Sequence, residues 1–219
     1  MDKNIKDLIE GHSDFQLVKF NKNKERFKTL VEEGQNPKAL FIGCSDSRVM
    51  PALITGSKPG DLFIARNIGN FVAPHNPNED YHATASAIEY AVSVLEVTDI
   101  IVCGHSECGA IAALYKKIKP NDENLHTIKW LELGEPAKKA ALLSLRGQPQ
   151  QEILEYTERV SVIFQLENLL SYPAVKRRVA EGTLFLHGWH YNIKDGNIEY
   201  YDEEAYQFKH LSEKVEEES

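Results

Sequence analysis

Three short, continuous apolar runs constrain the fold of this chain most strongly. They cover residues 39–42, 62–65 and 100–103 and consist of aliphatic, aromatic and cysteine side chains. The run at 39–42 is typical of a strand that is buried on both faces, and the other two runs predict further strands. Helical periodicity lies between them, as in residues 88–95, where apolar side chains recur at i, i+3, i+4 and i+7. The alternation predicts an α/β fold with a mostly parallel central sheet flanked by helices.

The chain is long enough for a single domain of this kind with additional helical segments. Apolar residues at helical spacing predict an N-terminal helical arm over residues 1–34. The α/β domain is expected over residues 35–205, closing with a strand pair at 183–187 and 198–201 around a turn. Residues 206–219 are expected to form an acidic, solvated tail.

Charge, hydropathy and cysteine content exclude several classes of protein. The chain has 33 acidic and 25 basic residues and no basic face, so nucleic acid is not an expected partner. No apolar run approaches the roughly 20 residues that span a bilayer, and the first residues do not resemble a signal peptide. We therefore expect no membrane partner and a cytoplasmic location. The three cysteines, Cys44, Cys103 and Cys108, are too few for a disulfide scaffold and are expected to be core residues, metal ligands or nucleophiles.

Two of the predicted strands end in residues that are able to bind a metal. Cys44 follows the first strand, and His105 and Cys108 follow the third. Ligands bind at the carboxyl edge of such sheets, so the three side chains converge if the two strands are neighbours. Two thiolates and one imidazole are a typical zinc set, and three protein ligands leave one tetrahedral position open, as in catalytic sites. A lone cysteine at a strand end is more often a core residue, but the three residues together favour a metal site.

Asp46 and Arg48 lie two and four residues after Cys44. Beside a metal, a carboxylate accepts a hydrogen bond from water, and a guanidinium group is able to hold that carboxylate in place. If Arg48 released Asp46, the carboxylate could fill the open position and shut the site.

Two other motifs match less well. Residues 104–109 have the spacing of a phosphate-binding loop, but the lysine that should follow is absent. Ser106 lies in a strand–turn–helix context like that of a serine hydrolase, with Asp195 and His210 downstream, but Cys108 replaces the closing glycine of that motif.

Taken together, the motifs resemble those of the β-class carbonic anhydrases. The sequences C-S-D-S-R-V at 44–49 and G-H-S-x-C-G at 104–109 look like that family's two zinc motifs, and the resemblance extends from about residue 35 to about residue 201. It implies one zinc ion per chain beside a catalytic dyad. The implied zinc ligands are Cys44, His105 and Cys108, and the implied dyad is Asp46 with Arg48.

The resemblance also implies a substrate pocket for carbon dioxide and bicarbonate. Gln35 would bind substrate across a dimer interface, and the Gly109 N–H would help to hold it. Phe63, Ile68 and Tyr90 match the apolar and aromatic lining. The family assembles as dimers or larger, so a homodimer or homotetramer is expected.

The implied activity is the reversible hydration of carbon dioxide to bicarbonate and a proton, with zinc supplying the attacking hydroxide. A carbonyl sulfide or carbon disulfide hydrolase on the same scaffold, and a non-catalytic zinc protein, are the alternatives. One subgroup of the family, with a closed zinc site, typically has Trp three residues before the first zinc cysteine. Phe41 at that position favours the plant-like, open-site subgroup, although Arg66 and Tyr90 are present.

Overall fold

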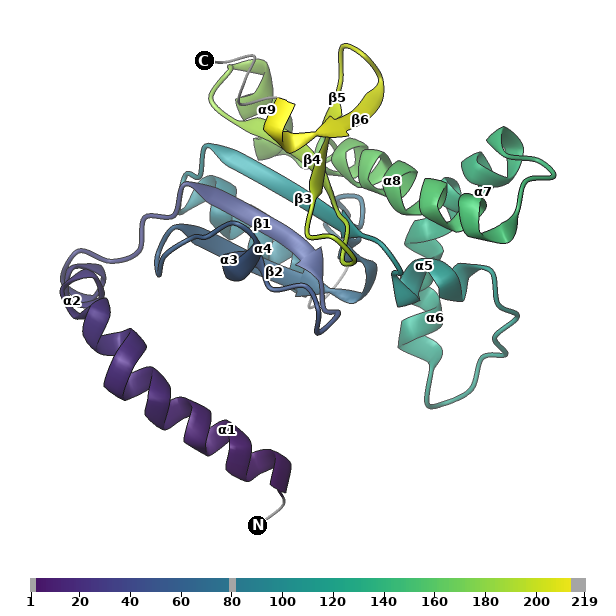
Figure 1. The fold of residues 1–219 in the computed structure, drawn as a ribbon. Coiled ribbons are helices and arrows are strands. Elements are labelled where there is room, and N and C mark those ends of the chain that lie inside the picture. The colour runs from purple at the N-terminus through teal and green to yellow at the C-terminus, as the bar shows by residue number, and fades with distance from the viewer. Residues whose placement is uncertain (1–2, 79–81, 214–219) are drawn as a thin grey trace. The chain divides into compact units, whose positions relative to one another are not determined.

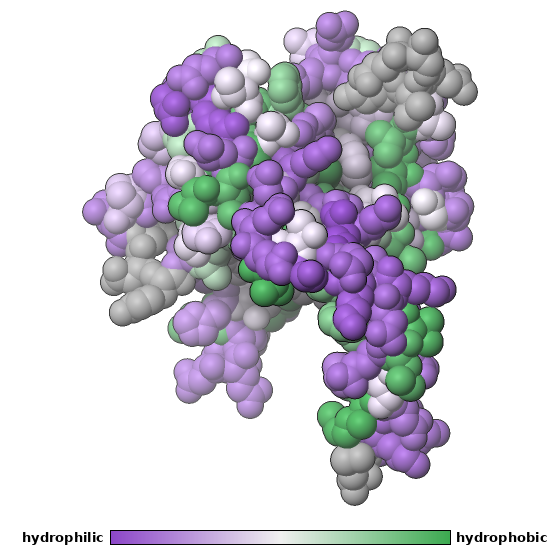
Figure 2. All heavy atoms as spheres, turned by 90° about the vertical axis from the view of Figure 1, so that its left-hand side faces the viewer, coloured by the Kyte–Doolittle hydropathy of each residue, from purple (hydrophilic) through white to green (hydrophobic). Residues whose placement is uncertain are grey.

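The computed structural model describes residues 3–78 and 82–213, and the chain forms two compact units, Met1–Asn36 and Pro37–Ser219. The first unit contains helix α1 (Lys3–Asp14), a π-helical segment η1 (Phe15–Phe20) and helix α2 (Lys24–Glu32) (Figure 1). Figure 2 shows hydrophobic side chains on the surface of these helices. Those that are exposed include Ile5, Leu8, Ile9, Leu17 and Val18.

A single mixed sheet forms the centre of the second unit (Figure 1). Within the described residues its strands follow the order β2-β1-β3-β4-β5-β6, parallel from β2 to β4 and antiparallel from β4 to β6. The strands are β1 (Ala39–Cys44), β2 (Leu62–Asn67), β3 (Asp99–His105), β4 (Phe185–Tyr191), β5 (Ile198–Asp202) and β6 (Gln207–His210). The predicted α/β fold with a mostly parallel sheet is therefore confirmed.

Strand β1 lies between β2 and β3, and this position decides where the site forms. Its residue Gly43 is paired with Arg66 of β2 and with Cys103 of β3. All six residues of β1 are buried, in agreement with the continuous apolar run in the sequence. Because β1 and β3 are parallel neighbours, their carboxyl ends meet at the same edge of the sheet.

Helices cover the sheet and supply the core. The long helix α8 packs against β3 and β4, and its side chains Val162, Leu166 and Leu169 share one apolar cluster with Ile42 and Val102. The helical segments of this unit are α3 (Pro51–Ile54), η2 (Ile68–Asn70), α4 (Ala83–Ser93), α5 (Gly109–Leu114), α6 (Leu125–Leu131), η3 (Glu132–Gly134), α7 (Glu135–Ser144), α8 (Gln150–Leu169) and α9 (Pro173–Ala180). In the described part of the chain, no helix combines the length and the apolar character needed to cross a bilayer.

The strands extend further than the apolar runs alone predict. Strand β3 continues to His105, so this histidine ends the strand, and α5 begins only at Gly109. Strand β4 continues to Tyr191. Strand β6 lies within the stretch assigned to the tail and pairs with β5, where the rings of Phe208 and Tyr201 lie 5.4 Å apart. Paired backbone groups and cross-strand side chains hold these extensions in the sheet, and neither is visible as a local apolar pattern.

Candidate metal centre

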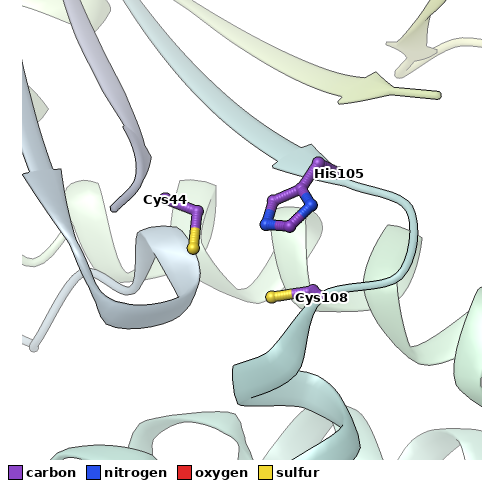
Figure 3. Close-up of side chains that lie close together, drawn as sticks. All are labelled: Cys44, His105 and Cys108. Carbon is purple, nitrogen blue, oxygen red and sulfur yellow. The ribbon is translucent and has the colours of Figure 1, made fainter. Parts of the chain in front are cut away.

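Cys44, His105 and Cys108 converge at the carboxyl edge of the sheet (Figure 3). Cys44 is the last residue of β1, His105 is the last of β3, and Cys108 immediately precedes α5. Their potential ligand atoms all lie within 4.8 Å of one another, and all three residues are buried. In Figure 3 the two sulfur atoms and the imidazole ring point toward one another. A single ion is thus able to contact all three side chains.

The imidazole of His105 is oriented for metal binding. Its Nδ1 lies 2.9 Å from the Ser106 carbonyl oxygen, which only accepts, so Nδ1 carries the proton. Its Nε2 is buried and has no hydrogen-bond partner among the described residues. A buried polar atom without a partner is costly in a folded protein, and a bound metal ion would satisfy it. The backbone bond at Nδ1 is the usual way in which a ligating imidazole is held.

The two cysteine sulfurs change each other's pKa. Hydrogen bonding from Cys108 lowers the pKa of Cys44 to about 4, against the effect of burial and with further help from His105 and the N–H groups of Asp46 and Gly69. The Cys44 thiolate in turn raises the pKa of Cys108. Cys44 therefore forms a thiolate readily, whereas Cys108 loses its proton only when a cation takes the place of that proton. A soft, borderline divalent ion such as zinc fits this donor set.

The backbone that carries Cys44 is fixed by contacts from β2 and η2. Arg66 donates from Nε to the Cys44 carbonyl oxygen at 2.9 Å and from Nη2 to the Asp46 carbonyl oxygen at 2.7 Å. The Gly69 N–H lies 3.4 Å from the Cys44 sulfur and donates to it. The sequence does not predict this role of Arg66, because the pairing of β2 with β1 is not visible in it.

Asp46 and Arg48 form a closely bonded pair beside the three ligands. Arg48 donates from Nε to Asp46 Oδ1 at 2.9 Å and from Nη2 to Asp46 Oδ2 at 2.7 Å. The Arg48 backbone N–H also donates to Oδ1, at 3.0 Å. Hydrogen bonding from Arg48 holds the pKa of Asp46 well below its ordinary value, so the carboxylate stays ionised. Among the described residues, Asp46 does not belong to the group of converging ligand atoms.

The residues expected to bind substrate fall in three places. Ile68 lies next to Gly69, and Gly109 follows Cys108, so both are at the metal centre. Phe63 and Tyr90 lie together, with ring centroids 5.8 Å apart. Phe63 is paired with Leu40, four residues before Cys44, which is about 13 Å along the strand. Phe63 and Tyr90 therefore do not lie beside the metal ligands of their own chain.

Gln35 belongs to the N-terminal unit, and its role stays a prediction.

A cavity of about 1010 Å³ lies at the edge of the metal centre. Its lining includes Ser45, Asn67, Ile68, His82, His126 and Trp130. The Trp130 indole donates to the Ile68 carbonyl oxygen at 2.7 Å and so fixes one wall of this cavity.

Two buried polar residues behind the centre were not predicted to take part in it. Glu158 of α8 accepts a hydrogen bond at 3.1 Å from the Cys108 N–H, and His190 of β4 lies next to it. Glu158 occupies the same helical stripe as Val162, Gln165 and Leu169, all of them buried. A glutamate on a core-facing stripe is the sequence signal that could have identified it.

Comparison with known proteins agrees with this geometry. The family described as carbonic anhydrase matches residues 39–198. A carbonic anhydrase of Pseudomonas aeruginosa is 40% identical over 210 residues, which are 95% of this chain and 93% of the relative. One from Synechocystis is 39% identical over 195 residues, covering 89% of this chain and 70% of the relative.

Solved structures show the same fold. The β-carbonic anhydrase CcaA superposes with a TM-score of 0.89 at 37% identity, covering 95% of this chain and 92% of that one. A tetrameric β-carbonic anhydrase from Sordaria macrospora gives a TM-score of 0.78 at 29% identity, covering 96% and 98%. The chain therefore belongs to the carbonic anhydrase family. Its fold and its Cys-His-Cys centre are those of the β class, which confirms the predicted zinc site and the predicted enzyme class, a zinc-dependent lyase.

Proposed function

We propose that this carbonic anhydrase hydrates carbon dioxide at an open metal site, in which Asp46 serves catalysis instead of binding the metal. The observation that carries the proposal is the pairing of both Asp46 carboxylate oxygens with Arg48, at 2.9 and 2.7 Å. Because Arg48 engages both oxygens, the Asp46 carboxylate is not free to serve as a fourth ligand. A metal ion held by the three ligands would then keep a coordination position for water and substrate.

Zinc held by the three ligands lowers the pKa of water and so supplies a nucleophile near neutral pH. In the proposal, the ionised Asp46 accepts a hydrogen bond from the attacking water and directs its lone pair at the carbon atom. Arg48 keeps the carboxylate in that orientation. The Gly109 N–H, at the start of α5, donates to a substrate oxygen as negative charge develops there.

The pocket for substrate is proposed to form between two chains. Ile68 comes from the chain that holds the metal, while Gln35, Phe63 and Tyr90 come from a second copy, which requires a homodimer or homotetramer. Two observations support this arrangement. Phe63 and Tyr90 lie away from their own metal centre, and Ile68 and Tyr90 expose 47% and 44% of their surface.

The plant-like, open-site subgroup and a cytoplasmic location complete the proposal. The subgroup is supported by the Asp46–Arg48 pair and by Phe41, which is fully buried and packs edge-on against Trp189 at 6.5 Å. The location is supported by the three cysteines, none of which forms a disulfide in the described part of the chain, as expected in a reducing compartment.

The test is stopped-flow hydration of carbon dioxide by zinc-replete wild type and by Arg48→Gln. The matched control is Arg177→Gln, which removes a similar exposed arginine–carboxylate pair, to Glu181 at 3.2 Å on α9. We expect Arg48→Gln to keep its zinc and to lose at least about tenfold in rate, because a misplaced catalytic group costs this much or more. The control should match wild type. Equal rates in the two variants would contradict the assigned role of Arg48, and a zinc-loaded wild type without hydration would contradict the proposed reaction.

A further inference from the structure

A chain of polar side chains, buried at the end next to the metal centre and partly exposed at the other, links α8 with β4 and β5. Glu158 Oε1 accepts a hydrogen bond from the Cys108 N–H at 3.1 Å, and Glu158 Oε2 lies 3.5 Å from His190 Nε2. On its other side, His190 Nδ1 lies 3.4 Å from Glu199 Oε2. That oxygen also accepts a hydrogen bond from Arg159 Nε at 2.8 Å. None of these four side chains takes part in the reaction described above.

The chain is sealed from solvent at the end next to the metal centre. Glu158 is 5% exposed and His190 is 1% exposed. A carboxylate is almost never buried to this degree unless other groups compensate it. Glu158 Oε1 is compensated by the Cys108 N–H, whereas Oε2 has no hydrogen-bond partner among the described residues and lies 3.5 Å from His190 Nε2. The carboxylate therefore has a fixed position from which it is able to hold a neighbouring group in place.

The segment that Glu158 contacts is short and strained. Between His105 and Cys108 the backbone turns through Glu107, which has a φ of +58°, a region that non-glycine residues rarely adopt. Arg48 donates to the Glu107 carbonyl oxygen at 3.1 Å, and the Ser106 N–H donates to the Tyr191 carbonyl oxygen at 3.0 Å. Glu158 supplies a further contact, at the residue that carries the sulfur.

Close packing of α8 on β3 makes this contact reachable. Gly104 precedes His105, and a Cβ atom there would lie 2.8 Å from Val162 Cγ2 and 3.4 Å from the Glu158 carbonyl oxygen. A larger residue at 104 would therefore push α8 away from the sheet. Gly104 is also paired with His190 in the sheet, so the same close approach brings Glu158 and His190 together.

We propose that Glu158 is a positioning residue for the metal centre: its buried carboxylate fixes the Cys108 backbone, and so the sulfur, where a metal ion needs it. His190 lies behind the carboxylate at 3.5 Å, and Glu199, which accepts a hydrogen bond from Arg159, lies 3.4 Å from the other ring nitrogen of His190. The role is geometric: it requires an acceptor oxygen at the right distance. The inference rests on Cys108 acting as a metal ligand in the proposed function, and it adds to that function a residue on a distant helix.

Two substitutions distinguish the position of the Glu158 acceptor oxygen from the charge of the carboxylate. Glu158→Gln keeps an acceptor oxygen at the same distance and removes the charge, whereas Glu158→Asp keeps the charge and withdraws the oxygen by about 1.5 Å. The matched control is Gln165→Asn on the same helix. Gln165 is fully buried and accepts a hydrogen bond from the Val72 N–H at 2.8 Å. Gln165→Asn therefore shortens the side chain by the same one carbon, but the backbone N–H that loses its acceptor belongs to Val72, which is not a metal ligand.

The measurements are the affinity for Co²⁺, by competition with a chelator, and the thiolate-to-cobalt absorption bands of the loaded protein. We expect Glu158→Asp to lose at least about tenfold in affinity and to show shifted bands, as is common when a group that orients a ligand is removed. Glu158→Gln and Gln165→Asn should stay within about twofold of wild type. The inference would be overturned if Glu158→Asp bound Co²⁺ as tightly as wild type, or if Glu158→Gln bound it as weakly as Glu158→Asp. An equal loss of Co²⁺ affinity in Gln165→Asn would overturn it as well.

A measurement on the wild type alone covers the case in which Glu158→Asp does not fold. In the metal-free protein, hydrogen exchange at the Cys108 amide should be slower by at least about a hundredfold than in an unstructured peptide. Exchange at the peptide rate would overturn the inference. Carbon dioxide hydration by the wild type is a separate measurement. A protein that binds Co²⁺ through its thiolates but does not hydrate carbon dioxide would contradict the proposed function and leave the role of Glu158 intact.

Discussion

Substitution of Gly69 tests how tightly η2 is fitted against the metal centre. Gly69 has a φ of +78°, and its N–H donates to the Cys44 sulfur. A Cβ atom there would lie 2.9 Å from both Ala110 Cβ and Phe71 Cζ, and Phe71 is fully buried. Neither neighbour is the far end of a flexible chain, so the backbone of η2 must move. We therefore expect Gly69→Ala to destabilise the protein and to disturb the contact with Cys44.

The magnitude follows from two separable terms. An L-residue in the left-handed region costs about 1–2 kcal/mol, and overpacking of a filled site adds about 1–3 kcal/mol. Their sum is about 2–5 kcal/mol. The matched control is Gly56→Ala, where φ is +62° but no described atom lies within 4 Å of the new Cβ. The control has the first term only, about 1–2 kcal/mol.

The assay is urea unfolding of both variants and wild type, followed by circular dichroism on zinc-loaded protein. Gly69→Ala should cost at least about 1 kcal/mol more than Gly56→Ala, which is the lower end of the overpacking term. Gly69→Ala should also release zinc to a chelator faster than Gly56→Ala does. Equal unfolding free energies in the two variants would refute the packing argument at Gly69.

Two further predictions concern the residues around the centre. His190, whose Nδ1 lies 3.4 Å away, and Arg159 lower the pKa of Glu199 to about 2, below its ordinary value of 4.5. The resulting stabilisation is present above about pH 4.5 and is lost as the pH falls toward 2. Glu199→Gln should therefore flatten the acid limb of an unfolding-versus-pH curve, and an unchanged limb would count against the pairing. Separately, Cys103→Ala should keep one zinc per chain by elemental analysis, whereas Cys108→Ala should lose its zinc. Cys103 is a fully buried core residue, and burial raises its pKa to about 12, so it is not expected to bind the metal as a thiolate. Zinc loss in Cys103→Ala would contradict the assignment of the ligands.

The sequence predicts the parts of the structure that depend on neighbouring residues. The strands β1, β2 and β3 are visible as apolar runs: β1 and β3 are buried inside the parallel part of the sheet, and β2 is its apolar but partly exposed edge strand. Cys44 and the His105–Cys108 pair are visible because each stands at the end of such a run. Their convergence depends on one fact of topology, the pairing of β1 with β3, which the sequence leaves as a condition.

Contacts between distant segments are not visible in this way. Glu158 lies 50 residues from Cys108, and only the packing of α8 on β3 brings them together. Arg66 contacts Cys44 because β2 pairs with β1. The register of β2 sets Phe63 back from its own metal centre by about 13 Å, so the proposed pocket takes Phe63 and Tyr90 from a second chain. Each of these contacts depends on how the sheet is ordered or on how closely a helix approaches it.

The most direct test of the account is carbon dioxide hydration by one protein sample before and after metal removal. The zinc-loaded protein should hydrate carbon dioxide rapidly, the metal-free protein should not, and the rate should return in proportion to zinc until one ion is bound per chain. Hydration that survives metal removal, or a fully reloaded protein that does not hydrate carbon dioxide, would contradict the claim that Cys44, His105 and Cys108 form the catalytic metal centre.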